Sequence, residues 1–371
     1  MSTKIFVITH KEYAEPDDTK TYSSMQVGSA INGRIEKYLC DDIGENISAR
    51  NDKYAELTGL YWIWKNYLNS PACEDNIGLC HYRRYFSNEM GERITSSQAD
   101  DILAKYDMIV SQTAESGVDA EESYRRCHNI NDLQTTIQVV TEYTPQFEKS
   151  FHKVLKSRAL CSANLMITNK KLMAEYCEWL FPVLFNVEKR IDISSYDDYH
   201  KRVFGFLSEI LHNVWIEQKQ LKIYKCPILL TGEKTETVQI KKMIRAMMDK
   251  GQFENAETEL QDMIKKRPDI MLAESDFDGE IRALYTILTI IRLEKSRNEN
   301  GILKYSSNTE EMLAHYRKVE TVLTAIEKNT ATESDLMYLL RGGVSGSMKE
   351  MILTNSDKIK DKNMVATVLG L

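Results

Sequence analysis

The stretch Asn76–Phe86, with the sequence NIGLCHYRRYF, joins a short apolar run to a dense polar cluster. Its residues 77–80 have the length of a buried strand, and the polar residues that follow at once are His81, Tyr82, Arg83 and Arg84. A buried strand cannot hold unpaired arginines, so the cluster is expected at the strand's end. In open α/β sheets ligands bind there, and paired arginines beside a histidine and tyrosines suit a phosphate-bearing ligand with a planar ring. The alternative is a pair of solvated surface arginines.

The bulk composition limits the remaining possibilities. The chain has 371 residues, a length typical of two domains or of one large domain with an appendage. Its net charge of −7 argues against a nucleic-acid binder held by a global positive field, so any phosphate recognition must be local. Its seven cysteines form no CxxC pair, which indicates reduced thiols rather than disulfides or a zinc site.

Two features of the sequence predict a cytoplasmic protein. Met1–Lys4 leads straight into a strand-like run, as in proteins without a secretory leader, and no apolar run reaches the roughly 18 residues of a membrane span. Attachment to the inner face of the cell membrane stays open through basic residues that either touch anionic lipid or form solvated helix faces. These residues are Lys241, Lys242, Lys265, Lys266 and Arg267.

A change of composition near Gly232 predicts two domains, residues 1–233 and 234–371. All tryptophans and cysteines precede this point. In the first part, short strands alternate with helices, a pattern that predicts an α/β domain with a mostly parallel sheet. Strands are expected at 5–8, 77–80, 106–110 and 165–168. Helices are expected over 56–66 with one buried face, over 131–157 with a break at Pro145, over 170–186 and from 202 onward.

The second part is predicted to be entirely α-helical. Gly251, Ala256, Leu260 and Pro268 fall at the spacings of one tetratricopeptide-like hairpin. A single repeat of this kind does not stack into a stable array, so a small helical bundle is expected, with self-association or a protein partner as its use. A flexible helical tail is the alternative.

Several familiar signatures of enzymes are absent. The sequence has no Walker A motif, no GxGxxG, no HExxH and no GxSxG. Its Asp-x-Asp lies at Asp276–Asp278, in the helical part, where a helix start or a surface feature explains it best. The sequence therefore assigns no metal ligand and no certain cofactor, although Mg²⁺ or Mn²⁺ remains compatible with a diphosphate substrate.

Polar clusters follow or precede several of the predicted strands and helices. They are His10 with Lys11, residues 46–51, His81 to Arg84, Asn164, and residues 202–209. Clusters at the strand ends of a parallel sheet converge on one crevice, where a nucleotide-linked substrate fits. Taken alone, each cluster also has a purely structural explanation. His10 is then a histidine whose hydrogen bonds are made within the protein, and Glu209 is a carboxylate on a helix surface.

Four motifs of the first part resemble a known family. They are NISARN at 46–51, ELTGLYWIWKN at 56–66, IGLCHYRRYF at 77–86 and RVFGFLSE at 202–209. Together they resemble a bacterial glycosyltransferase family of capsular and exopolysaccharide clusters, formerly catalogued as a domain of unknown function, that includes galactofuranosyltransferases. The resemblance covers about residues 3–230. It implies a GT-A-like nucleotide-sugar-binding domain. It also implies transfer of a sugar, such as galactose or galactofuranose, from a UDP-linked donor to a glycan or lipid-linked glycan.

The resemblance and the chemistry of the residues together assign roles. Arg83, Arg84 and Lys11 would bind the donor diphosphate, and Glu209, with His81 second, would deprotonate the acceptor hydroxyl. Binding of the nucleotide or sugar is assigned to His10, Asn46, Ser48, Asn51, Tyr82, Asn164 and Arg202. The alternative is a catalytically degenerate protein that binds glycans or partners through its helical part. Ile210, where the family often has Arg, favours that alternative.

Overall fold

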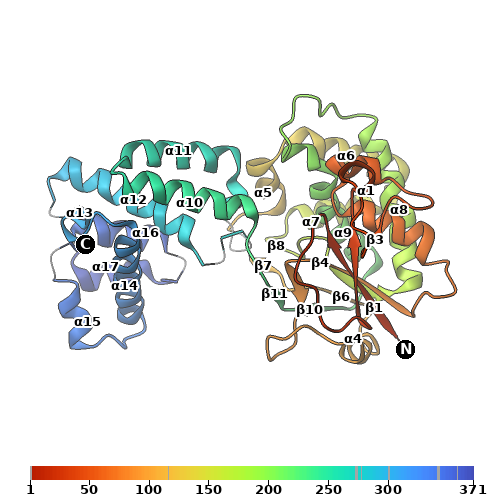
Figure 1. Cartoon of the computed structure of the whole chain (residues 1–371), viewed down its shortest axis with the longest axis horizontal. Helices are drawn as coiled ribbons and strands as arrows, with labels where there is room; N and C mark the ends of the chain where they lie inside the picture. The colour runs from red at the N-terminus through yellow and green to blue at the C-terminus, as the bar shows by residue number, and fades with distance from the viewer. Residues whose placement is uncertain are drawn as a thin grey trace. The chain divides into compact units, whose positions relative to one another are not determined.

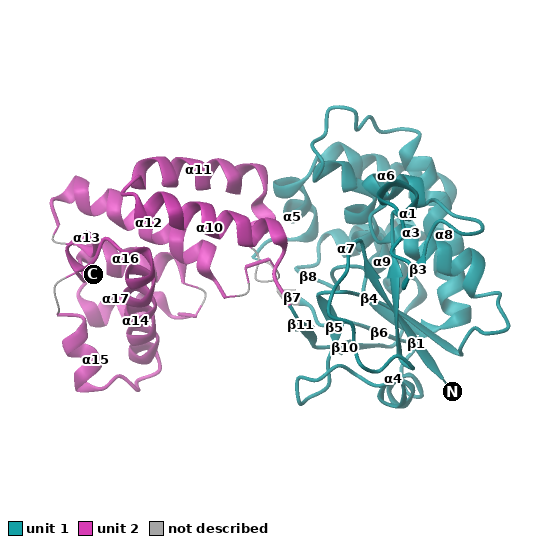
Figure 2. Ribbon diagram, in the orientation of Figure 1, with its two compact units in different colours: residues 1–231 teal, residues 232–371 magenta. Residues whose placement is uncertain are grey.

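The chain folds into two compact units, residues 1–231 and 232–371, each with its own hydrophobic core (Figure 2). The computed structural model describes residues 2–115, 117–271, 275–276, 278–299, 301–340, 343–356 and 358–371.

The first unit is built on a sheet with the spatial order β10-β6-β9-β4-β1-β2-β3, to which β5 and β11 are attached (Figure 1). A two-stranded ribbon, β7 with β8, is separate from it. The strands are β1 (Thr3–Thr9), β2 (Tyr22–Gln26), β3 (Leu39–Cys40), β4 (Asn76–His81), β5 (Arg84–Phe86), β6 (Met108–Ser111), β7 (Ala114–Glu115), β8 (Ala159–Leu160), β9 (Met166–Asn169), β10 (Ile223–Cys226) and β11 (Ile228–Leu230).

The main path of this sheet is mostly parallel, as the sequence predicts. β1 runs parallel to β2 and β4, and β10 runs parallel to β6, whereas β9 is antiparallel to both of its neighbours, β4 and β6. The reversal of β9 has a useful consequence. Its first residues lie at the same edge of the sheet as the carboxyl ends of β1 and β4, so a polar residue that precedes β9 joins those that follow β1 and β4.

Helices cover both faces of the sheet. One face carries Phe6 and Ile8 of β1 against a large core that includes α3 and α6 to α9, and the other carries Ile5 and Val7 against β5 and α4. The helices of this unit are α1 (Ser29–Asn32), η1 (Ser48–Arg50), α2 (Asn51–Tyr54), α3 (Leu57–Trp62), η2 (Ile63–Tyr67), α4 (Ser96–Leu103), α5 (Ala120–Cys127), α6 (Ile130–Tyr143), η3 (Pro145–Phe147), α7 (Glu148–Leu155), α8 (Lys170–Glu188), η4 (His200–Arg202) and α9 (Val203–Lys219).

Helix α3 and its π-helical continuation η2 correct the expectation of a helix with one buried face. Every residue from Leu57 to Ile63 is buried. Gly59 lets the helix lie close to the sheet, because a Cβ there would come within 2.8 Å of Ile8 Cδ1 and 2.9 Å of Val27 Cγ1. The segment is therefore an inner layer of the domain.

The hairpin β4–β5 is completed by the end of the unit. Strand β11 pairs antiparallel with β5, with Leu230 opposite Arg84 and Ile228 opposite Phe86. Thr231 then donates its backbone N–H to the carbonyl of Arg83 at 3.1 Å. The polar cluster of the motif thus lies in a turn whose backbone is held by residues from the far end of the domain.

The second unit consists of helices, as expected. They are α10 (Thr235–Asp249), α11 (Phe253–Lys266), η5 (Pro268–Met271), α12 (Glu280–Arg297), α13 (Ile302–Tyr305), α14 (Thr309–Glu327), α15 (Glu333–Tyr338), α16 (Gly346–Asn355) and α17 (Lys362–Leu369). α10 and α11 form the predicted hairpin. Gly251 has a φ of +72° at the bend, and Ala256 and Leu260 of α11 are fully buried.

Lys241 corrects the idea of a solvated basic face on α10. Its side chain is 8% exposed, and its ammonium pairs with Glu233, Asp276 and Asp278 at 2.5–2.9 Å. The Asp-x-Asp of the sequence therefore serves an internal ion cluster. Among the described residues, no helix is long and apolar enough to cross a membrane.

Candidate functional site

The centre of the candidate site is His81, the last residue of β4. In the sheet, His81 pairs with Ile8 of β1 on one side and with Arg84 of β5 on the other. Tyr82 donates its N–H to the carbonyl of Ile8 at 3.1 Å, and its own carbonyl accepts a hydrogen bond from Thr231 Oγ1 at 3.3 Å. The backbone that presents the polar cluster is thus fixed on both sides before any ligand binds.

The electrostatic surroundings of His81 bring together residues from three segments of the chain. Burial is the largest influence on the imidazole, and it lowers the pKa to about 4. The carboxylate of Glu56 acts in the opposite direction, whereas Arg84, Arg83 and Arg202 lower the pKa further. The imidazole is therefore neutral at pH 7 and can accept a proton or a hydrogen bond.

Glu56 is a site residue that the sequence argument missed. Its Oε1 accepts a hydrogen bond of 2.6 Å from Asn164 Nδ2, which also donates to the carbonyl of Gly205 at 3.2 Å. Asn164 is 2% exposed and has a φ of +53°, and it directly precedes the β9 region at the sheet edge. Its Oδ1 is buried and has no hydrogen-bond partner within the described residues. A buried carbonyl oxygen of this kind is costly unless a ligand or water donates to it.

Local backbone strain positions Glu56. The preceding Ala55 has φ 47° and ψ −127°, a conformation that side-chain-bearing residues rarely adopt. Asn51 stabilises it, because its Nδ2 donates to the carbonyl of Ala55 at 2.7 Å and to Thr58 Oγ1 at 3.0 Å. The break between α2 and α3 thus turns Glu56 toward Asn164. The only signal in the sequence is that Glu56 begins a motif of the resemblance.

A second group of predicted residues surrounds the ring of Tyr82. His10 contacts it edge-on with ring centroids 5.5 Å apart, and Tyr13 lies 5.8 Å away. The cations of Lys11 and Arg83 lie 5.6 and 5.2 Å from its centroid. Half-buried aromatic rings flanked by cations can stack with a planar base while the cations approach a phosphate.

The predicted residues Asn46, Ser48 and Asn51 hold the loops beside this site. Ser48 Oγ donates to the buried Asp41 at 2.5 Å and accepts from the N–H of Ala30 at 3.1 Å. Asn46 Oδ1 accepts from the N–H of Ser48 at 3.2 Å. These side chains are engaged within the protein, so the structure gives them a positioning role. Direct contact with a donor stays a prediction for all three.

Arg202 and Glu209 lie on η4 and α9. Arg202 is exposed, and its guanidinium lies 5.7 Å from the Phe206 ring while its charge acts on His81. Glu209 lies one turn beyond Gly205 and is half-buried, and its carbonyl accepts from Asn213 Nδ2 at 2.8 Å. The next residue, Ile210, is 5% exposed and packs in the core, where an apolar side chain is well accommodated.

With this geometry in place, comparison with known proteins identifies the family. Residues 4–220 match the family described as "Domain of unknown function (DUF4422)", which is more than half of the chain. The chain belongs to the DUF4422 family. All residues of the His81 centre lie within the matched range, whereas the helical unit lies outside it. No curated protein matches the chain.

The first unit also resembles a solved structure. The apo structure of the bifunctional glycosyltransferase WbbM aligns with a TM-score of 0.55 and 25% sequence identity, over 62% of this chain and 46% of that one. This DUF4422 member therefore spans less than half of the length of WbbM. The similarity supports a glycosyltransferase-like α/β fold for the part that aligns.

The ligating groups in this DUF4422 domain do not fit a bound divalent cation. Mg²⁺ and Mn²⁺ prefer several oxygen ligands, whereas the His81 centre offers three guanidinium groups, an imidazole and the carboxylate of Glu56. Among the described residues, three carboxylates lie close enough to share an ion at Glu233, Asp276 and Asp278, and the ammonium of Lys241 already binds them. The positive charge comes from arginines at the His81 centre and from Lys241 at the carboxylate cluster.

Proposed function

We propose that this protein is a glycosyltransferase that moves a sugar from a UDP-linked donor to a glycan or lipid-linked glycan acceptor. We place it in the assembly of a surface polysaccharide, in the cytoplasm or at the inner face of the cell membrane, with galactose or galactofuranose as the candidate sugar. The proposal is supported by the family, by the likeness to a glycosyltransferase structure and by the chemistry of the His81 centre.

One observation carries the proposal: at the carboxyl end of β4, the charges of three arginines and of one carboxylate act on the buried, neutral imidazole of His81. Arginines bind paired phosphate oxygens in a fixed fork geometry, so Arg83, Arg84 and Arg202 suit a diphosphate. Arg83 also lies beside the aromatic cluster around Tyr82, which suits the base of a nucleotide. Because these groups do not fit a divalent cation, the arginines supply the positive charge in the proposed reaction, and no step below depends on a metal.

The proposed reaction uses these groups in order. The bond between the sugar's anomeric carbon and the diphosphate oxygen breaks, and the diphosphate leaves with the electron pair while the arginines stabilise its developing charge. The acceptor hydroxyl attacks the anomeric carbon and loses its proton to a base. Glu209 and His81 are the bases that the sequence suggests, and Glu56 is the carboxylate that lies beside His81.

Calorimetric binding of UDP tests the diphosphate site. We expect Arg83→Ala to bind UDP about 10- to 100-fold more weakly than the wild type, since a charge-assisted hydrogen bond contributes about 1.5–3 kcal/mol. Binding of the wild type should survive EDTA. Arg126→Ala on α5 is the matched control, because Arg126 is an exposed arginine paired with Glu122.

Two results would contradict the proposal. Equal UDP affinities for Arg83→Ala and the wild type would remove the arginines from the diphosphate site. No binding of UDP or of other nucleoside diphosphates by the wild type would favour the alternative, a degenerate transferase that works through its helical unit. That unit exposes Leu336, Met337 and Leu340, the last to 76%, which is the observation that favours a partner there.

A further inference from the structure

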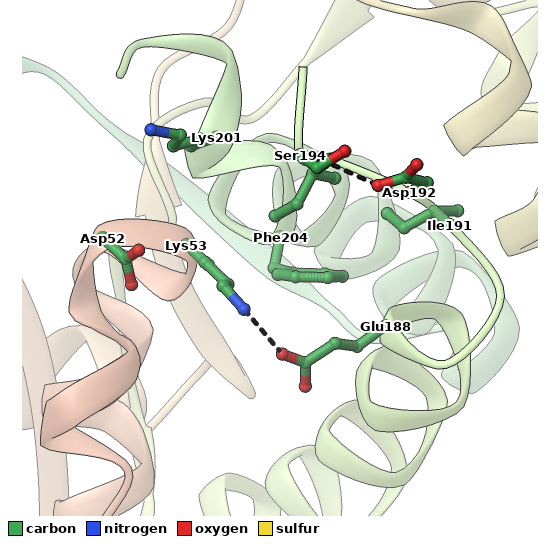
Figure 3. Close-up of a pocket in the computed structure, with 9 residues that line it drawn as sticks. Asp52, Lys53, Glu188, Ile191, Asp192, Ser194, Lys201 and Phe204 are labelled. Carbon is green, nitrogen blue, oxygen red and sulfur yellow. Dashed lines mark hydrogen bonds and ion pairs between the residues drawn. The ribbon is translucent and has the colours of Figure 1, made fainter. Parts of the chain in front are cut away.

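A cavity of about 340 Å³ lies in the first unit, outside the His81 centre. Its lining comes from α2, the end of α8, the segment that follows α8, and the start of α9 (Figure 3). The lining residues are Asp52, Lys53, Glu188, Ile191, Asp192, Ile193, Ser194, Lys201 and Phe204. The volume falls in the lower part of the range of small-ligand sites, roughly 300–1,000 Å³.

The charges around this cavity limit the class of ligand. Three carboxylates and two ammonium groups line it, and the guanidinium of Arg50 pairs with the lining Glu188 at 3.1 Å, so the cavity has no excess of positive charge to attract a phosphate. An apolar ligand would desolvate these charges without replacing their hydrogen bonds. A neutral molecule rich in hydroxyl groups can donate to the carboxylates and accept from the lysines, because each hydroxyl does both.

The groups around the cavity differ in how far they are already engaged. Glu188 pairs with Lys53 at 3.6 Å and accepts a hydrogen bond from the Tyr54 hydroxyl at 3.0 Å. Asp52, by contrast, has no hydrogen-bond or ion-pair partner in the described parts of the chain, and Figure 3 shows its carboxylate at the edge of the cavity. Lys201 pairs only loosely with the fully exposed Asp198, at 3.2 Å. Asp52 and Lys201 can therefore turn to a ligand at little cost.

Apolar atoms complete the lining. Ile191 and Ile193 are half-buried, and the buried Phe204 lies beneath them, where it stacks on Tyr54 at 4.5 Å. A sugar ring presents an apolar face of C–H groups and a rim of hydroxyls, so it matches an apolar floor with charged groups around it.

The cavity and the His81 centre are built on the same chain segments. Lys201 lines the cavity, and the adjacent Arg202 acts on His81. Phe204 lines the cavity, and the adjacent Gly205 accepts a hydrogen bond from Asn164. Adjacent residues of η4 and α9 thus serve both the cavity and the His81 centre, as expected where a chain-like ligand extends past a reaction centre.

We propose that this cavity binds one sugar ring of the glycan acceptor. The inference rests on the proposed function, because only a glycosyltransferase reaction at the His81 centre makes the ligand an acceptor. The rest of the glycan extends from this ring toward the His81 centre, and the cavity then selects which glycan is extended.

Saturation-transfer NMR with methyl glycosides tests the cavity. The probes are the methyl glycosides of galactose, glucose, mannose and N-acetylglucosamine, and UDP affinity is measured on the same samples. We expect at least one glycoside to bind the wild type and to bind the double variant Asp52→Ala/Lys201→Ala about tenfold more weakly. Asp198→Ala is the matched control, because it removes the same ion pair without changing the lining.

The two readouts separate this inference from the proposed function. If UDP binds but no glycoside does, or if the double variant binds glycosides as the wild type does, the acceptor cavity is wrong and the transferase proposal stands. If a glycoside binds in the cavity but UDP does not bind the wild type, the cavity is a glycan site and the transferase proposal fails. Failure of both readouts overturns both.

Discussion

Ala55 shows how a single residue with no reactive side chain positions a residue of the candidate site. Its left-handed backbone costs about 1–3 kcal/mol, and the hydrogen bond from Asn51 to its carbonyl offsets part of that cost. The change of backbone direction at Ala55 places the carboxylate of Glu56 where it accepts a hydrogen bond from Asn164. At the same place, the buried Oδ1 of Asn164 has no hydrogen-bond partner among the described residues. A donor sugar with a free hydroxyl would satisfy it.

Paired carboxylate variants decide which group acts as the base. We expect Glu56→Gln to lose about 100- to 10,000-fold in turnover of UDP-galactose or UDP-galactofuranose, the usual range for a general base, while UDP affinity is retained. Glutamine keeps the oxygen that accepts from Asn164, so the local structure should survive. The rate of UDP release measures the effect.

Glu209→Gln is the comparison for this experiment. A large loss in Glu209→Gln with a small loss in Glu56→Gln would assign the base to Glu209, as the resemblance suggests. Large losses in both variants would mean that the two carboxylates act on the same proton. Full turnover in both variants would leave His81 as the base.

The location of a site residue was predictable where it directly follows an apolar strand. His81, Arg83 and Arg84 follow an apolar run, and their grouping at its end could be inferred from solvation alone. Glu56 could not be inferred in this way, because its placement depends on the positive φ of Ala55. Positive φ values are usually predicted at glycine, and the sequence has an alanine there. Asn164 joins the same edge only because β9 runs antiparallel, which no local pattern reveals.

At the scale of elements, β4 is the strand on which the site depends. It lies between β1 and β9, and Gly78 at its middle leaves room for both neighbours. A Cβ at this position would come within 2.8 Å of Ile167 Cγ1 and 3.1 Å of Ile5 Cγ1. Both of those side chains are β-branched and stiff, so they cannot move away at low cost.

We therefore expect Gly78→Ala to destabilise the first unit by about 1–3 kcal/mol, the usual cost of overpacking a core. Urea unfolding followed by tryptophan fluorescence measures the change. Gly117→Ala serves as the control, because no atom lies within 4 Å of a Cβ built there. An unchanged midpoint in Gly78→Ala would mean that β1 and β9 can separate to admit a methyl group.

Elements with a clear apolar run or a helical period were predictable, including the four-residue strands β6 and β9, whereas short strands without such a run were not. The predicted helices over 131–157 and 170–186 and the strands at 5–8 and 77–80 are all present, with the break at Pro145. β5, β10 and β11 have only three or four residues each, and they form because β11 returns to pair with β5 while β10 pairs with β6. β2, with the sequence YSSMQ, has serines where a buried parallel strand usually has Val or Ile, so propensity gave no signal.

At the scale of the whole molecule, the two units have separate hydrophobic cores. The ion cluster around Lys241 belongs to the second unit, and all four tryptophans belong to the first. This distribution gives each unit its own probe. Tryptophan fluorescence reports on residues 1–231, whereas circular dichroism at the helical band reports on both units.

We expect Lys241→Ala to destabilise the second unit by about 3–5 kcal/mol, because it leaves three carboxylates close together without their cation. The circular-dichroism transition should split or shift, while the fluorescence transition and UDP affinity stay unchanged. The neighbouring Lys242→Ala is the control, since Lys242 is exposed. A matching shift in fluorescence would show that the two units unfold as one.

The pairing of β11 with β5 also bears on how the protein is made. The turn that carries Arg83 and Arg84 emerges early from the ribosome, but the strand that closes it is the last of its domain. Contacts between residues so distant in the chain form slowly, because the intervening segment must first be ordered. A nascent chain halted before residue 230 would carry the whole stretch 76–86 without a finished hairpin. Nucleotide binding by ribosome-bound intermediates is thus expected to begin only once β11 has left the exit tunnel.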